Sequence, residues 1–201
     1  MVFSTAYLPP IEYFKELAKY RSIYIDKYEN YIKQTYRNRC NIYTANGKLS
    51  LSVPVIKTTG NHTKIKDIEI DNNQAWQHIH WLSIESAYNS SPFFLYYRDY
   101  FEPFYNKKFK YLIDLNTELL YLLLKLCDIS CEIKFSESYI ETSEILKDYK
   151  SIISPKNKKS LVPIFPEYTQ VFDDKHGFMQ NLSIVDLLFC EGTGCRTYLE
   201  L

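Results

Sequence analysis

The sequence predicts an α/β protein: a small mixed sheet with an N-terminal βαβ-like unit and a hairpin, packed by a largely helical second half. Three observations predict this fold. A strand, a helix and a second strand fit within residues 2–26, an Asn-Gly pair divides two alternating segments, and helical patterning dominates after residue 73. With 201 residues, 46% of them hydrophobic, the chain suits one domain over residues 1–201.

The N-terminal segments indicate a βαβ-like unit. Residues 2–7 form a short strand candidate, which Pro9 and Pro10 end. A helix is expected over residues 11–20, and residues 22–26 (SIYID) are rich in the β-branched and aromatic residues that favour strands. Two strands so close to one helix suggest parallel pairing.

The next segments predict a hairpin, a further strand and then helices. Alternating apolar residues flank Asn46-Gly47, which is a strong signal for a turn between residues 39–43 and 49–53. We expect a strand over 67–70 and a helix to residue 89, capped by Asn72 or Asn73. The remaining expectations are more helix after Ser91-Pro92 to residue 129, a strand over 132–135, and a capping box, Ser183 to Asp186, before a helix that Gly192 ends.

Composition excludes several function classes. None of the five glycines is arranged as a phosphate-binding loop, which argues against a P-loop ATPase or a standard dinucleotide site. Lysine plus arginine and aspartate plus glutamate both number 24, so net charge gives no general reason to bind nucleic acid or an anionic membrane. We therefore expect no nucleic-acid partner.

The expected compartment is the cytoplasm. The N-terminus lacks the pattern of a signal peptide, and the apolar stretch 111–129 carries charged residues, among them Asp114, Glu118 and Lys125, which predicts a buried helix and no transmembrane segment. The five cysteines form no Cys-x-x-Cys pair and fit reduced, mostly structural thiols.

A cation-rich segment, residues 31–39, offers the first candidate site. If the chain is extended, Lys33, Arg37 and Arg39 share one side, while Tyr36 and Asn38 lie on the other. The functional interpretation is an edge that binds phosphate or carboxylate, because guanidinium and ammonium groups suit these anions. The alternative is a solvated hairpin strand with ordinary ion pairs.

A histidine-containing helix, residues 76–88, offers the second candidate site. Helical spacing places Trp76, His80, Ile84 and Ala87 on one stripe, and His78, Trp81, Glu85 and Tyr88 on another. Because the two imidazoles then point apart, we expect no metal site. His80, or in second place His78, is a candidate general base, against the alternative of a core histidine. Glu85 is a candidate partner for a cation of residues 33–39.

Two other groups complete the candidates. His176, beside Gly177, can join a site but suits an exposed loop equally well. The aromatic run over residues 93–105 is typical of a core or of a homo-oligomer surface, and is a weaker match to a base-stacking platform.

Taken in order, these segments resemble the WbqC-like protein family. The resemblance rests on Tyr7-Leu8-Pro9-Pro10-Ile11-Glu12-Tyr13-Phe14, Ile25-Asp26, Lys33, Tyr36-Arg37-Asn38-Arg39, Leu51-Ser52-Val53-Pro54-Val55, Trp76-x-x-x-His80, Ala87-Tyr88, Ser91-Pro92-Phe93-Phe94 and Leu182 to Leu188. The family commonly has Trp-x-Asn-Arg where this chain has Tyr36-Arg37-Asn38-Arg39.

The resemblance implies a bacterial protein of surface-polysaccharide (O-antigen-like) biosynthesis. It suggests a transferase that moves a glycyl, aminoacyl or acyl group to an amine or hydroxyl of a small-molecule or lipid-linked sugar; it indicates no particular cofactor. In this hypothesis Lys33, Arg37 and Arg39 hold the anion, His80 deprotonates the acceptor and Tyr88 orients it. Ser183 and Asp186 are further motif positions. The alternative is a non-catalytic binding or assembly protein of the same pathway.

Overall fold

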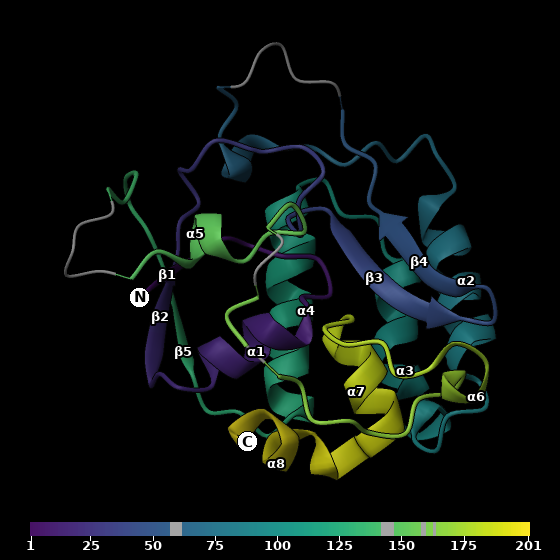
Figure 1. Cartoon of the computed structure of the whole chain (residues 1–201). Helices are drawn as coiled ribbons and strands as arrows, with labels where there is room; N and C mark the ends of the chain where they lie inside the picture. The colour runs from purple at the N-terminus through teal and green to yellow at the C-terminus, as the bar shows by residue number, and fades with distance from the viewer. Residues whose placement is uncertain (57–61, 142–146, 158–159, 163) are drawn as a thin grey trace.

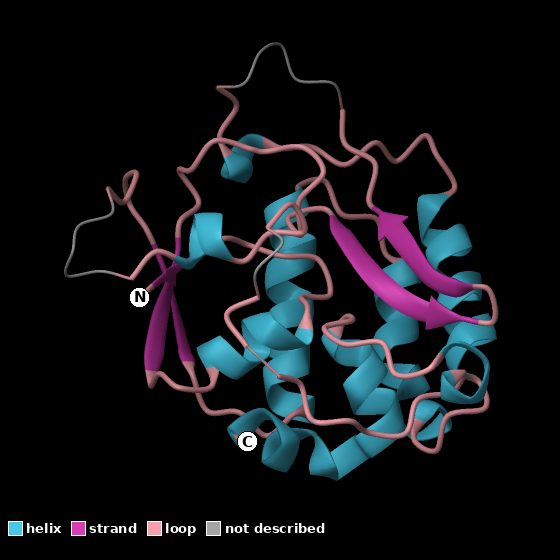
Figure 2. Cartoon of the chain, in the orientation of Figure 1, coloured by secondary structure: helices cyan, strands magenta, loops and turns pink. Residues whose placement is uncertain are grey.

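A computed structural model describes residues 1–56, 62–141, 147–157, 160–162 and 164–201. Its strands form two separate sheets, drawn in magenta in Figure 2. One sheet has three strands in the order β1-β2-β5, and both pairings are parallel. Its strands are β1 (Val2–Phe3), β2 (Ser22–Ile25) and β5 (Glu132–Phe135). The predicted α/β class and the parallel βαβ-like unit are confirmed.

The predicted hairpin forms the second sheet. Strands β3 (Arg39–Thr44) and β4 (Gly47–Ser52) pair in antiparallel register, with Thr44 opposite Gly47. Gly47 has a φ of 90°, a conformation that glycine adopts without steric cost. The Asn-Gly signal therefore located the turn.

Helices fill the space between and around the sheets. In the view of Figure 1, α4 lies between the parallel sheet on the left and the hairpin on the right. The helices are α1 (Ile11–Leu17), α2 (Trp76–Tyr88), α3 (Phe94–Asn106), α4 (Leu112–Leu126), α5 (Tyr149–Ile152), α6 (Asp173–His176), α7 (Ile184–Glu191) and α8 (Cys195–Glu200), with 3-10 turns η1 (Ile65–Asp67) and η2 (Gly192–Gly194).

An aromatic cluster joins α2, α3 and α7. The ring of Phe189 lies 5.2–5.4 Å, centroid to centroid, from the rings of Tyr88, Phe94 and Phe101. All four side chains are buried, so much of the aromatic run on α3 belongs to the core. The outward face of the same helix exposes Leu95, Tyr96 and Tyr100.

Three local expectations differ from the structure. Residues 67–70 form no strand; η1 is followed by isolated bridges at Glu69 and Ile70. The cap of α2 is Ala75, because the Asn72 side chain donates instead to the carbonyl of Phe109.

The capping box before α7 is the third difference. The helix starts at Ile184 as expected, but the Ser183 hydroxyl donates 2.8 Å to the carbonyl of Leu8 and does not cap the helix. A tertiary contact thus replaced the local one. At the other end Gly192, with a φ of 56°, terminates α7 as predicted.

None of the helices in the described ranges is both long and apolar enough to span a bilayer.

Candidate functional site

The carboxyl ends of the three parallel strands bring polar side chains together. Ser4, Asp26 and Ser136 each follow directly after a strand of this sheet. Because parallel strands all end at the same edge, these three side chains converge there. This edge is the usual place for ligands in open α/β sheets.

Asp26 is the centre of the first half of the site. Its fully buried carboxylate accepts from Lys150 Nζ at 2.8 Å, from Ser136 Oγ at 3.0 Å, and from the backbone N–H groups of Tyr28 and Ile140 at 3.0 and 3.1 Å. Burial alone would raise the pKa of Asp26, but the hydrogen bonds outweigh it, and the pKa lies below its usual value. Asp26 is therefore an ionised anchor for Lys150.

Glu29 and Arg37 form the second half. The guanidinium donates from Nε to Glu29 Oε1 at 2.9 Å and from Nη2 to Oε2 at 2.5 Å. Ser4 accepts from Arg37 at 2.7 Å and donates to Glu29 at 3.1 Å. Burial raises the pKa of Glu29, although Arg37 favours its ionised form.

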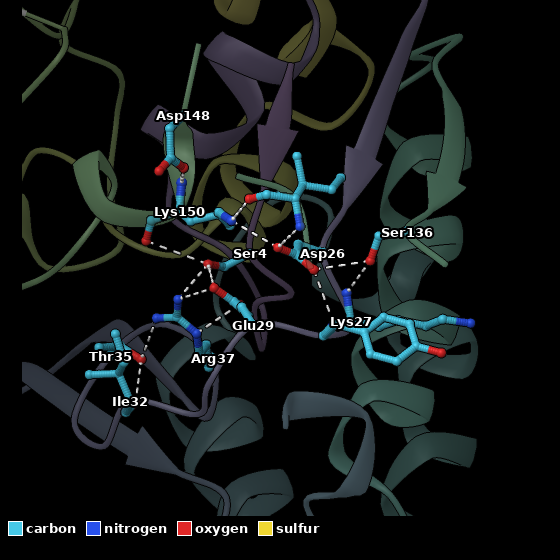
Figure 3. A network of polar contacts seen from close by, with 12 residues as sticks. Ser4, Asp26, Lys27, Glu29, Ile32, Thr35, Arg37, Ser136, Asp148 and Lys150 are labelled. Atoms are coloured by element: carbon cyan, nitrogen blue, oxygen red, sulfur yellow. Dashed lines mark hydrogen bonds and ion pairs between the residues drawn. The ribbon is translucent and has the colours of Figure 1, made fainter. Parts of the chain in front are cut away.

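The Glu29–Arg37 pair and Lys150 border one pocket of about 480 Å³. Figure 3 shows Lys150 above Ser4 and Arg37 below it, with Glu29 beside Arg37 and Asp26 to the right of Lys150. The ring of Tyr139 closes one wall, with its centroid 4.5 Å from Lys150 Nζ. The lining residues include Glu29, Arg37, Lys64, Tyr139, Asp148 and Lys150. A pocket with cations, buried carboxylates and an aromatic wall can bind an anionic or hydroxyl-rich ligand and move a proton.

The structure separates the three predicted cations. Residues 33–38 form bends and turns rather than an extended strand, so the expected alternation is absent. Lys33 is exposed, Arg37 turns inward to Glu29, and Arg39 Nε donates 3.0 Å to the Ser52 hydroxyl on the hairpin. Of this trio, Arg37 alone lines the pocket.

Tyr36 and Asn38 flank Arg37 but have other surroundings. Tyr36 borders a second, smaller cavity of about 270 Å³ beside Asn41 and Asn181, and burial raises its pKa to about 12. Asn38 donates 2.9 Å to the carbonyl of Val53, while its buried side-chain oxygen accepts no hydrogen bond within the described chain. The Asn38 contact fixes the loop against the hairpin.

The two histidines of α2 differ in burial. His80 is 4% exposed, and its Nδ1 lies 2.9 Å from the hydroxyl of Tyr7. Burial lowers the pKa of His80 to about 4, which keeps the imidazole neutral at pH 7. His78 is exposed on the opposite face. His80 does not line the pocket that Lys150 borders. This position weakens the hypothesis that His80 acts on a substrate bound in that pocket.

Glu85 pairs with a cation other than the expected ones. Its carboxylate lies 2.9 Å from Arg98 of α3, so it contacts a neighbouring helix and no cation of residues 33–39. His176 is exposed, and its Nε2 lies 3.0 Å from the carbonyl oxygen of Ala45. Both contacts link elements of the fold.

Tyr88 and Asp186 meet in a buried polar cluster. Asp186 accepts from Tyr88 at 2.7 Å, from Tyr168 at 2.5 Å and from Gln170 at 2.9 Å. Burial raises the pKa of Asp186 despite these donors. The Tyr88 hydroxyl also accepts from the backbone of Tyr43 at 3.2 Å, which joins α2, α7 and the hairpin.

Most residues of the pocket carry no signal in the sequence. Asp26 carried a usable signal, because it is the last residue of the predicted strand 22–26 in a parallel unit. Glu29 and Lys150 carried none: one lies in an irregular loop and the other in the polar region 136–160, where no periodicity locates a side chain. Among the described residues, no group of three or more histidine, cysteine, aspartate or glutamate side chains is arranged to hold a metal ion.

Comparisons with known proteins agree with the resemblance drawn from the motifs. The uncharacterized protein Rv1507c of Mycobacterium tuberculosis is 30% identical over 134 residues, which cover 66% of this chain and 58% of that protein. No solved structure matches. The model of the WbqC-like protein family matches residues 5–160, a range that includes Asp26, Glu29, Arg37 and Lys150. The chain therefore belongs to the WbqC-like protein family.

Proposed function

We propose that the protein is a transferase of surface-polysaccharide (O-antigen-like) biosynthesis that moves a glycyl, aminoacyl or acyl group onto an amine or hydroxyl of a sugar. The supporting observation is the convergence of Arg37, Lys150 and Glu29 on one pocket at the carboxyl edge of the parallel sheet. The chain belongs to the WbqC-like protein family, and the resemblance of its motifs to that family implies this class of reaction.

The pocket supplies the groups that such a transfer needs. Lys150 and Arg37 can hold a carboxylate or phosphate of the substrate, because both are cations kept in place by buried carboxylates. Glu29 becomes the proposed proton acceptor in place of His80, since burial shifts its pKa towards the range of a general base.

In the proposed transfer, the amine or hydroxyl of the sugar attacks the carbonyl carbon of an activated acyl donor and forms a new carbon–nitrogen or carbon–oxygen bond. The bond from that carbon to the donor's leaving group breaks, and the leaving group takes the electron pair. The proton of the acceptor passes to Glu29, and Lys150 offsets the negative charge that develops.

The test is a complementation experiment. In a strain without the gene, mass spectrometry of the surface polysaccharide should show a repeat unit that lacks one acyl substituent. The wild-type gene should restore it, and so should Lys156→Met, which alters an exposed lysine on the neighbouring loop. Lys150→Met should not restore it.

A second variant separates chemistry from folding. Lys150→Arg keeps the positive charge against Asp26 and should fold, but should transfer poorly because its planar head differs in shape and reach. If Lys150→Met and Lys150→Arg both accumulate as folded protein and both restore the substituent, this site is wrong.

The exposed face of α3 favours a second candidate, a non-catalytic assembly protein. Leu95 and Tyr96 are both 70% exposed and Tyr100 is 44% exposed, so the segment expected to contact a partner does present apolar surface. Under this alternative, Leu95→Ser with Tyr96→Ser should dissociate an oligomer in analytical ultracentrifugation. A wild-type protein that is already monomeric at high concentration argues against it.

A further inference from the structure

A cleft larger than the pocket beside Lys150 lies across a ridge of the chain that borders this pocket. Residues 27–31 and 63–66 form this ridge, joined by backbone hydrogen bonds such as Lys66 N to Lys27 O at 3.1 Å and Ile65 N to Glu29 O at 3.0 Å. Glu29 and Lys64 of the ridge line the pocket, whereas Lys27 and Lys66 line the cleft. In Figure 3 the Lys27 side chain points away from the network around Asp26.

Lysines dominate the wall of this cleft, which encloses about 630 Å³. Five border it: Lys27, Lys66, Lys107, Lys108 and Lys110. The only acidic residues on its wall, as far as the structure describes the chain, are Asp114 and Glu118, so five positive charges face two negative ones, a local excess of three. The whole chain has 24 charges of each sign, so this excess is a local feature.

Ion pairs leave part of this charge uncompensated. Lys107 lies 2.9 Å from Glu118, Lys66 lies 2.9 Å from Asp67, and Lys110 lies 3.6 Å from Glu69. Lys27 and Lys108 form no ion pair within the described ranges. Both can therefore turn towards an anion without breaking a salt bridge.

The floor of the cleft is apolar. Phe109 and Ile113 are buried, and Phe135 at the end of β5 packs partly buried against the core. The Lys107 ammonium lies 4.4 Å from the centroid of the Phe109 ring. Ile113 and Asp114 belong to the first turn of α4, where the partial positive charge of a 15-residue helix adds to that of the lysines. Cations above an apolar floor fit a molecule with an anionic group attached to an apolar or planar part.

We propose that this cleft binds an organic diphosphate, with the phosphates against Lys27 and Lys108 and the organic part on Phe109 and Ile113. The two phosphate groups would meet the two lysines of the cleft that form no ion pair within the described ranges. Nucleoside and prenyl diphosphates share this chemistry. Binding in this cleft is separate from the proposed transfer reaction and can be measured without turnover.

Calorimetry on the full chain tests it with three probes: inorganic pyrophosphate, uridine diphosphate and farnesyl diphosphate. At least one organic diphosphate should bind more tightly than pyrophosphate, and its affinity should fall as salt increases. The organic diphosphate with the higher affinity shows which kind of organic group, a nucleoside or a prenyl chain, binds on the apolar floor. If neither organic probe binds more tightly than pyrophosphate, the proposal is overturned.

A pair of double variants provides the control. Lys27→Glu with Lys108→Glu should weaken binding by about tenfold or more, because two repulsive charges then face the phosphates. Lys125→Glu with Lys175→Glu changes net charge equally at exposed sites outside the cleft and should bind like the wild type. Equal affinities of the two double variants would also overturn the proposal. Lys150→Met should bind normally, which separates this site from the transferase pocket.

Discussion

The Nδ1 atom of His80 and the hydroxyl of Tyr7 share a hydrogen bond of 2.9 Å between residues 73 positions apart in the chain. The same hydroxyl lies 3.0 Å from that of Tyr105. Burial raises the pKa of Tyr7 and lowers the pKa of His80 to about 4, so both groups are neutral at pH 7. His80 thus fits a hydrogen-bonded core residue that links α2 to the N-terminal segment.

This burial predicts a pH-dependent stability. Between pH 4 and the ordinary histidine value of 6.5, His80 is protonated in the unfolded chain but not in the folded one. The unfolded state then binds more protons, so the free energy of unfolding decreases as the pH falls through this window. The total loss from this group should be roughly 3 kcal/mol, measured by urea denaturation at several pH values.

His78 offers a matched control on the same helix. His80→Gln should flatten the pH dependence within the window, while His78→Gln, at an exposed position, should leave it unchanged. A wild-type slope in His80→Gln would show that another group titrates there.

Removal of one partner of the Glu29–Arg37 pair should markedly lower the free energy of unfolding. Both side chains are nearly buried, at 6% and 4% exposure, so Arg37→Met leaves an unpaired carboxylate and should cost about 3–5 kcal/mol in the free energy of unfolding. Glu29→Gln with Arg37→Met should cost less than the sum of the single changes, measured as a double-mutant cycle by chemical denaturation. Lys134→Met, in an exposed pair with Glu132, should cost below about 1 kcal/mol. Additive single changes would contradict the coupling.

Tyr88→Phe tests whether the buried tyrosine is structural or acts on a substrate. The change removes the donor to Asp186 at 2.7 Å and leaves a buried carboxyl group less satisfied, which should cost about 1–3 kcal/mol. Tyr96→Phe, at a position 70% exposed, should be neutral in the same denaturation measurement. A Tyr88→Phe protein with full stability but no acyl transfer would restore the catalytic hypothesis for this residue.

Gly192 and Gly177 form another matched pair. Both have a positive φ, 56° and 71°, so alanine is strained at either position by about 1–3 kcal/mol. A Cβ at Gly192 would also lie 2.6 Å from the ring of Phe93, whereas nothing lies within 4 Å of one at Gly177. Gly192→Ala should therefore lower the melting temperature more than Gly177→Ala. Equal losses would mean that Phe93 moves aside without cost.

Local patterns predicted much of the fold. Asn46-Gly47 located the hairpin because the turn needs a residue with positive φ, and close spacing of two strands and a helix indicated the parallel unit. The stripe of Trp76, His80, Ile84 and Ala87 is buried, as helical periodicity requires. Expectations failed where a tertiary contact replaced a local one, as when the Ser183 hydroxyl bonded to Leu8.

The candidate site was less accessible to prediction. The segment 33–39 drew attention as a cluster of cations, yet only the fold decided that Arg37 would turn inward while Lys33 faced solvent. Glu85 shows the same limit, because its partner proved to be Arg98 on the packed neighbour helix. The sequence shows which charged side chains are present, and the packing of the fold determines which of them form ion pairs.

The sequence by itself determined the α/β class, the hairpin turn, the amphipathic helices and the family, because these depend on local spacing and on motifs in chain order. The tertiary structure alone decided the pocket. Lys150 reaches Asp26 across 124 positions of sequence, and the two meet because Asp148, just before α5, bridges Val2 of β1 and so brings Lys150 to the sheet edge where Asp26 follows β2. Because burial removes water from these charged groups, each is stable only beside a partner of opposite charge. No local sequence pattern specifies that partner.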